Sequence, residues 1–190
     1  MDLISNSKTA GQLYDQLIEI QMFLHSFHKP IVSIIQGQCL GGGFELALAS
    51  HYRIGIENTH LKFALPEVKL GIMPGLGGTQ RLPRLIGLEA ALPIILKGKS
   101  VDEHQAVHCG IIDELATSKQ AAIQAAKQSI INHSTHPALK KIHPYTNEHM
   151  LQFASASALS KKVTQGCYPN VEYILQSLYE GALFSIDHAL

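Results

Sequence analysis

The chain has 190 residues, of which 46% are hydrophobic and 16% charged, and its 15 basic and 15 acidic side chains give a formal net charge of zero. This length predicts one domain with a real core, and the balanced charge argues against nucleic acid or an anionic membrane as a partner. The three cysteines lie far apart without a CxxC pair, which favours free thiols in a reducing compartment.

The eleven histidines raise the question of a metal site. Two pairs, His104 with His108 and His133 with His136, have spacings that fit one helix face, but no HExxH motif or cysteine partner accompanies them. We therefore predict no metal site. The amino-terminal residues lack the pattern of a secretory signal, and the longest apolar stretch, 31–40, is too short to span a bilayer. These features predict a cytoplasmic protein without a membrane span.

The first half of the chain alternates between helical and extended patterns. Residues 9–27 have the periodicity of an amphipathic helix, which Pro30 ends. The β-branched run at 31–35 predicts a buried strand. The elements expected next are a glycine turn opening a short helix within 41–50, and strands at 52–56 and 61–64. This order predicts an α/β fold rather than a helical bundle.

The second half is predicted to be mainly helical. Helices are expected at 78–86, 88–97, 101–109, 119–133 and 171–184, with a brief extended segment at 110–114. Residues 134–169 contain three prolines and many polar side chains, which predict an irregular excursion with one short helix near 148–160. We accordingly divide the chain into a core region, 1–116, and a helical carboxy-terminal region, 117–190.

The first candidate functional segment joins three consecutive glycines, 41–43, to Glu45. Glycine allows strained dihedral angles and close approach of a ligand to the backbone, and amide N–H groups at the start of a helix favour negative charge. Such a peptide can hold the oxyanion of an enolate. The same helix position favours Glu45 as a carboxylate, which suits a general base. For the glycines alone, a turn that serves only packing is the commoner explanation.

A second glutamate, Glu67, follows Pro66 in a mostly apolar stretch. The proline stiffens the corner, and apolar surroundings disfavour an ionised carboxyl, so Glu67 is predicted to act as a proton donor near neutral pH. Taken alone, such a glutamate is more often an exposed turn residue. Two carboxyls in different environments, however, are how one site supplies both acid and base.

A third glycine-rich turn runs over 71–81 and contains Gly75 and Arg81. Glycines before a helix with an arginine in its first turns can cradle a phosphate. The segment matches neither the P-loop nor the dinucleotide-binding glycine motif. A loop that enters a packed helix explains it at least as well, and both interpretations stay open.

Taken together, these motifs resemble the crotonase (enoyl-CoA hydratase/isomerase) family. The resemblance is strongest over 31–84 and continues through the segments GKSVDEHQA from Gly98 and GIIDE from Gly110. The two glutamates are 67 − 45 = 22 positions apart, and this spacing, with Pro169 in a GCYPN context, is most similar to the hydratase half of the multifunctional α-subunits of fatty-acid β-oxidation. The resemblance implies a crotonase-like spiral of ββα units, trimers or hexamers built from them, and acyl-CoA thioesters as substrates.

The resemblance also implies a role for each motif. Gly42 matches the glycine whose N–H donates to the thioester oxygen, with Gly43, Pro66 and Gly75 as further substrate-binding positions. Glu45 matches the base that activates water, and Glu67 the acid that protonates the α-carbon. Retaining both favours an enoyl-CoA hydratase, with no cofactor beyond the coenzyme A of the substrate. The alternatives are a Δ3,Δ2-enoyl-CoA isomerase that uses Glu67 alone, and a catalytically silent acyl-CoA-binding or oligomer-partner protein.

The chain departs from the family pattern at its beginning. Family members carry an upstream Ala-Gly-Ala-Asp-type segment that supplies the second oxyanion N–H, and Met1 is expected to follow directly after that segment. We also expect no dehydrogenase half. Loss of one oxyanion donor typically costs about 3–4 kcal/mol of transition-state stabilisation, so reduced activity is expected.

Overall fold

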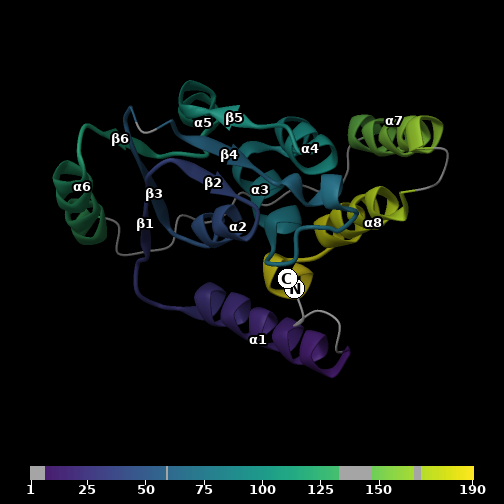
Figure 1. Cartoon of the computed structure of the whole chain (residues 1–190), viewed down its shortest axis with the longest axis horizontal. Helices are drawn as coiled ribbons and strands as arrows, with labels where there is room; N and C mark the ends of the chain where they lie inside the picture. The colour runs from purple at the N-terminus through teal and green to yellow at the C-terminus, as the bar shows by residue number, and fades with distance from the viewer. Residues whose placement is uncertain (1–6, 59, 133–146, 165–167) are drawn as a thin grey trace.

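The computed structural model describes residues 7–58, 60–132, 147–164 and 168–190, and Figure 1 shows how their elements are arranged. The helices are α1 Ser7–Ser26, α2 Gly42–Leu48, the 3-10 helix η1 Pro66–Leu70, α3 Gly78–Ile86, α4 Leu88–Lys97, α5 Glu103–Cys109, α6 Lys119–Asn132, α7 Asn147–Thr164, α8 Pro169–Leu183 and α9 Ile186–Ala189. The strands are β1 Val32–Ile35, β2 Gln38–Leu40, β3 Tyr52–Ile56, β4 Lys62–Ala64, β5 Val101–Asp102 and β6 Glu114–Ala116.

The strands form two small sheets. In the first, β1, β3 and β6 lie side by side and run parallel, with Ile34 opposite Ile54. In the second, β2 pairs parallel with β4, and β4 pairs antiparallel with β5. The first four strands of the chain therefore alternate between the two sheets, after which β5 joins the second sheet and β6 the first. Parallel neighbours require crossover connections, and α2 lies in the connection from β2 to β3.

Two apolar clusters hold the elements together. The larger core contains buried side chains from the second sheet and from α2, α3, α4, α5 and α8, including Phe44 and Phe63, whose ring centroids lie 5.5 Å apart. The smaller one packs α6 against the first sheet through Ile54, Ala122 and Ala126. Figure 1 shows α6 beside β1, β3 and β6, with α7 and α8 at the opposite end of the molecule.

Most predicted elements are confirmed, and the α/β class with a helical carboxy-terminal part is correct. The expected helix at 101–109 is wrong in its first turn because residues 101 and 102 pair with β4. Asp102 instead caps α5, accepting a hydrogen bond from the Gln105 N–H at 2.9 Å. Strand β2 was not predicted. The expected buried strand at 31–35 is only partly buried, since Ile34 is exposed and Ile35 is enclosed.

The expected polar excursion over 134–169 lies partly outside the described residues, which omit 133–146 and 165–167. Its predicted short helix exists as the longer α7, and Pro169 already belongs to α8. The division into regions 1–116 and 117–190 stays a prediction. No helix among the described residues is long and apolar enough to cross a membrane.

Helix α1 is formed as predicted but buries little of its apolar face. Leu17, Ile20 and Phe23 are exposed, whereas the polar Gln21 is 5% exposed. Figure 1 shows α1 lying along one side, apart from both sheets. The amphipathic pattern therefore located the helix but did not identify which side chains this fold encloses.

Candidate active site

The two predicted glutamates follow neighbouring strands. Because β2 and β4 run parallel with Leu40 opposite Ala64, the chain leaves both strands at the same edge of the sheet. The Gly41 N–H donates to the Ala64 carbonyl at 2.9 Å and ties the first turn to the end of β4. The segments carrying Glu45 and Glu67 therefore begin at one place, although they are far apart in the sequence.

Gly41 is the residue that turns β2 into α2. Its φ of +56° lies in the left-handed region, and a Cβ there would lie 2.9 Å from Glu67 Oε1. Position 41 therefore requires glycine for two reasons: the positive φ is unfavourable for other residues, and a side chain would collide with the Glu67 carboxyl. Helix α2 then begins at Gly42 and places Glu45 in its first turn with a relative exposure of 2%.

The Glu45 carboxylate is held by a loop from a third part of the chain. Its Oε1 accepts hydrogen bonds from the N–H groups of Leu76 and Gly78, both at 2.8 Å. The contact is close, because a Cβ on Gly78 would lie 2.9 Å from the same oxygen. These donors fix the Glu45 side chain at the start of α3. The glycine-rich turn over 71–81 was recognised from the sequence as a candidate site, but no sequence pattern indicated that it contacts Glu45.

Glu67 is the second residue of η1, which begins at Pro66 and ends at Gly71. Its side chain is buried, with 9% relative exposure, so the exposed-turn alternative is wrong. Its Oε1 faces Gly41, whereas its Oε2 is buried and has no hydrogen-bond partner among the residues that the structure describes. A buried oxygen without a partner is rare in folded proteins and calls for an explanation such as a catalytic role or a ligand.

Burial raises the pKa of both carboxyls. For Glu67, burial acts first and the nearby Glu45 charge adds to it, as predicted from its apolar surroundings. For Glu45, burial also raises the pKa, although backbone N–H groups and the Arg81 charge oppose the increase. The helix position and the N–H donors favour the carboxylate form, but desolvation has the larger effect and the net change in the pKa of Glu45 is upward.

The predicted substrate-binding glycines surround this pair. Gly42 and Gly43 form the exposed first turn of α2, where N–H groups lack a carbonyl partner within the helix. Gly75 is exposed, and its N–H is among the backbone groups that lower the pKa of Glu45. Pro66 precedes Glu67 directly. The substrate-binding role of these four residues stays a prediction.

Arg81 does not provide a phosphate cradle. Its side chain is 2% exposed, and its Nη1 donates to the Leu76 carbonyl at 2.8 Å. The guanidinium is thus turned into the protein, and the interpretation as a loop entering a packed helix is the better one. Gln80 and Arg84 of the same helix bind α8, through the Ser177 carbonyl at 2.9 Å and the Gly181 carbonyl at 2.7 Å.

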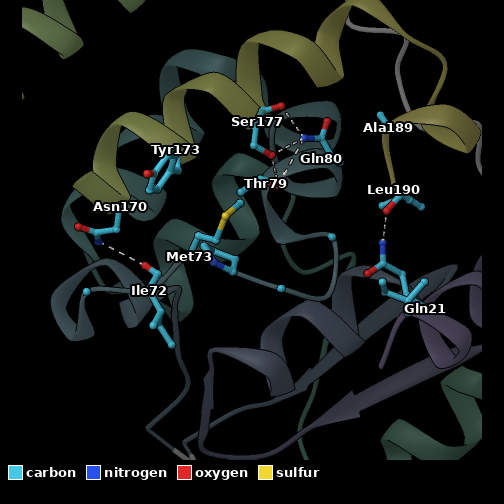
Figure 2. A pocket seen from close by; sticks show the side chains of 15 residues that line it. Gln21, Ile72, Met73, Thr79, Gln80, Asn170, Tyr173, Ser177, Ala189 and Leu190 are labelled. Carbon is cyan, nitrogen blue, oxygen red and sulfur yellow. Dashed lines mark hydrogen bonds between the residues drawn. The ribbon is translucent and has the colours of Figure 1, made fainter. Parts of the chain in front are cut away.

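A cavity of about 600 Å³ lies between α1, α8, α9 and the 71–80 segment. Figure 2 shows Asn170, Tyr173 and Ser177 of α8 on one side, with Gln21 and Leu190 on another. Gly75 and Gly77 line the cavity, but neither glutamate does. The Asn170 Nδ2 donates to the Val68 carbonyl at 3.0 Å and so connects α8 to η1. The complete lining is Ile18, Gln21, Gly71, Ile72, Met73, Pro74, Gly75, Gly77, Thr79, Gln80, Asn170, Tyr173, Ser177, Ala189 and Leu190.

Comparison with known proteins identifies the class of protein to which this fold corresponds. The model of the family described as enoyl-CoA hydratase/isomerase matches residues 3–165. The chain therefore belongs to the enoyl-CoA hydratase/isomerase family, and the predicted crotonase-like fold is confirmed.

Solved structures agree. DspI from Pseudomonas aeruginosa is similar with a TM-score of 0.60 at 27% identity, over 79% of this chain and 66% of DspI. Enoyl-CoA hydratase from Bacillus anthracis is similar with a TM-score of 0.59 at 26% identity, over 96% of this chain and 65% of that protein. The hydratase from Thermoplasma volcanium, with a TM-score of 0.60 at 22% identity over 91% of this chain and 64% of that protein, supports the fold alone. The chain thus spans slightly less than two thirds of the length of these three proteins.

Proposed function

We propose that this protein is an enoyl-CoA hydratase, which adds water across the 2,3 double bond of an acyl-CoA thioester. The observation that carries the proposal is the meeting of two buried carboxyls from α2 and η1. Glu45 and Glu67 lie close enough for the charge of one to affect the pKa of the other. Membership of the enoyl-CoA hydratase/isomerase family supports the substrate class.

In the proposed reaction, the Glu45 carboxylate accepts a proton from water as the water oxygen bonds to the β-carbon. The electrons of the double bond move onto the thioester oxygen, where exposed N–H groups of Gly42 and Gly43 provide stabilisation. Glu67, whose burial raises its pKa and so favours the protonated form, then donates its proton to the α-carbon. Glu45 ends with one proton more and Glu67 with one fewer, and exchange with solvent restores both.

Glu67 Oε2, which has no hydrogen-bond partner among the described residues, fits this role. A carboxyl that donates its proton to a substrate carbon needs one oxygen that is not bound to another protein group. We place the acyl chain toward the 600 Å³ cavity, since Gly75 belongs both to its lining and to the surroundings of Glu45. None of the lining side chains carries a charge at neutral pH. Such a lining suits a neutral acyl group rather than a second anion.

The test is the hydration of a short 2-enoyl-CoA by purified protein, followed through loss of the conjugated double bond. Glu45→Gln and Glu67→Gln should each lose at least about a hundredfold in kcat, the scale of general acid–base catalysis. Glu89→Gln is the matched control, because Glu89 is exposed on α4. Wild-type rates in either active-site variant would remove that residue from the mechanism.

The same variants separate the alternatives. If the protein moves the double bond of a 3-enoyl-CoA and tolerates Glu45→Gln but not Glu67→Gln, it is an isomerase. Binding of the CoA ester without any turnover would identify a silent acyl-CoA-binding protein. Assembly into trimers or hexamers, a cytoplasmic location and a relation to multifunctional α-subunits belong to the same proposal. Size-exclusion chromatography with light scattering tests the assembly.

A further inference from the structure

The backbone of one residue, Leu76, connects the Glu45 carboxylate to a buried arginine. The Leu76 N–H donates to Glu45 Oε1 at 2.8 Å, and the Leu76 carbonyl accepts from Arg81 Nη1, also at 2.8 Å. The next residue, Gly77, has a φ of +89°, and a Cβ there would strike the Arg81 guanidinium. The loop is thus fixed on one side by the arginine and presents its N–H groups to the glutamate.

Packing alone does not account for a charged residue at this position. Arg81 is 2% exposed, and within the described part of the chain its buried Nη2 has no hydrogen-bond partner. Enclosing a cation with one donor unpaired is unfavourable, and an apolar side chain of similar size would avoid that penalty. Burial lowers the pKa of Arg81 to about 10, so the side chain remains charged at neutral pH. The charge of Glu45 opposes this decrease and raises the pKa of Arg81.

We propose that Arg81 is a positioning residue for the general base. Its guanidinium binds the Leu76 carbonyl and so fixes the loop whose Leu76 and Gly78 N–H groups hold the Glu45 carboxylate in place. Its charge stabilises that carboxylate. The catalytic consequence rests on the proposed hydratase function. The effect of Arg81 on Glu45 does not, and it can be measured without turnover.

Two ionisable groups besides Arg81 bear on this effect. Glu67 of η1 lies close enough to Glu45 for the Glu45 charge to raise the pKa of Glu67, so Glu67 is kept unchanged in every variant. Cys39 lies on β2, which packs against α2, and burial raises its pKa to about 11, so the thiol stays neutral over the range tested. Removal of the Arg81 charge should therefore change the Glu45 titration with the other groups unaltered.

The experiment is a titration of glutamate side-chain carboxyl carbons by carbon-13 NMR, with the Glu45 signal identified by its loss in Glu45→Gln. The variants are Arg81→Met, which removes the charge, and Arg81→Lys, which keeps it. Arg84→Met is the matched control, because Arg84 is also buried in α3 but binds the carbonyl groups of Gly181 and Phe184. The hydration rate of each variant, measured against pH, is the second readout.

Arg81→Met should raise the Glu45 midpoint by about one pH unit, since a nearby cation favours the ionised form. Arg81→Lys should stay close to the wild-type midpoint but lower kcat more than it changes KM, because lysine keeps the charge and loses the planar guanidinium. An unchanged midpoint in Arg81→Met, or an equal shift in Arg84→Met, overturns the inference.

If Arg81→Met does not fold, Arg81→Lys decides. A wild-type kcat in that variant rules out positioning by the guanidinium, and a midpoint raised above wild type rules out the role of the charge. Absence of hydration by the wild-type protein would overturn the proposed function, while the NMR titration would still decide whether Arg81 controls Glu45.

Discussion

Replacing Gly78 with alanine should disable Glu45 while leaving the fold largely intact. The new Cβ would lie 2.9 Å from Glu45 Oε1, 3.0 Å from Glu45 Cγ and 3.1 Å from Leu65 Cδ1. Leu65 is fully buried and has little room to move. The glutamate must therefore shift and weaken its bonds to the N–H groups of Leu76 and Gly78.

The expected magnitudes favour a loss of activity over a loss of folding. Overpacking at Gly78 costs about 1–3 kcal/mol, and alanine in a helix returns about 0.5–1 kcal/mol relative to glycine. The net effect, about 0–2.5 kcal/mol, is less than the stability of an ordinary domain. A hydrogen bond to a charged group contributes about 1.5–3 kcal/mol, so losing one would raise the pKa of Glu45 by about 1–2 units.

The assay is hydration of a 2-enoyl-CoA as a function of pH, with thermal denaturation in parallel. The acid side of the kcat/KM profile should move to higher pH, and the rate near neutrality should fall about ten- to a hundredfold. Gly11→Ala is the control, because a Cβ at that α1 position meets nothing within 4 Å. A Gly78→Ala protein with the wild-type rate and an unmoved acid limb would refute the contact between loop and base.

Three further outcomes are expected. Gly41→Ala should lower both the melting temperature and the hydration rate. The φ of +56° at this position costs alanine about 1–2 kcal/mol, and the added Cβ would lie 2.9 Å from Glu67 Oε1. Equal melting curves for variant and wild type would contradict this prediction. The pKa of Glu67 is raised above 4.5 in the folded protein, so the stability that comes from its bound proton is present below pH 4.5 and is lost as the pH rises through the folded pKa. Glu67→Gln should therefore have a higher melting temperature than wild type at about pH 8 and the same one at about pH 4. A difference that stays constant with pH would argue against titration of Glu67. Asp113→Asn should lower the free energy of unfolding, measured in urea, by about 1.5–3 kcal/mol, the contribution of a hydrogen bond to a charged group. The reason is that Asp113 pairs at 2.7 Å with Arg53, whose side chain is 4% exposed. A change below about 0.5 kcal/mol would show that the pair is dispensable.

The sequence predicted the order of the elements well because their signals are local. Periodicity, prolines and glycines placed α2, α3 and α4 closely. The prediction from sequence failed for segments whose secondary structure depends on pairing with a distant strand. Strand β2 has only three residues, two of them exposed, and it is extended because β4 lies beside it. The short β5 likewise replaced one helical turn by pairing with Phe63.

The candidate site shows the same limit. The residues 41–43, Glu45 and Glu67 could be selected from motifs, but their meeting at one sheet edge depends on β2 and β4 being parallel neighbours. The Leu76 and Gly78 donors to Glu45 come from more than thirty positions away, and no local pattern marks such a contact. For this reason the effect of burial on the pKa of Glu45 was also not predicted. A helix position is readable from sequence, whereas desolvation depends on what the complete fold places over the carboxyl.

The unpaired atoms of this region argue for a site rather than a structural cluster. Glu67 Oε2 and Arg81 Nη2 are both buried, and neither has a hydrogen-bond partner in the described ranges of the chain. A core selected only for stability would exclude such groups, because each one destabilises the folded state. Glu45 is buried as well, yet it receives two N–H donors. This difference between Glu45 and Glu67 agrees with the proposed chemistry. A general base must be held in a fixed orientation toward water, whereas a general acid needs one oxygen available to protonate the substrate carbon. A stabilising Glu67→Gln substitution that abolishes turnover would therefore be the signature of a group retained for function at the expense of stability.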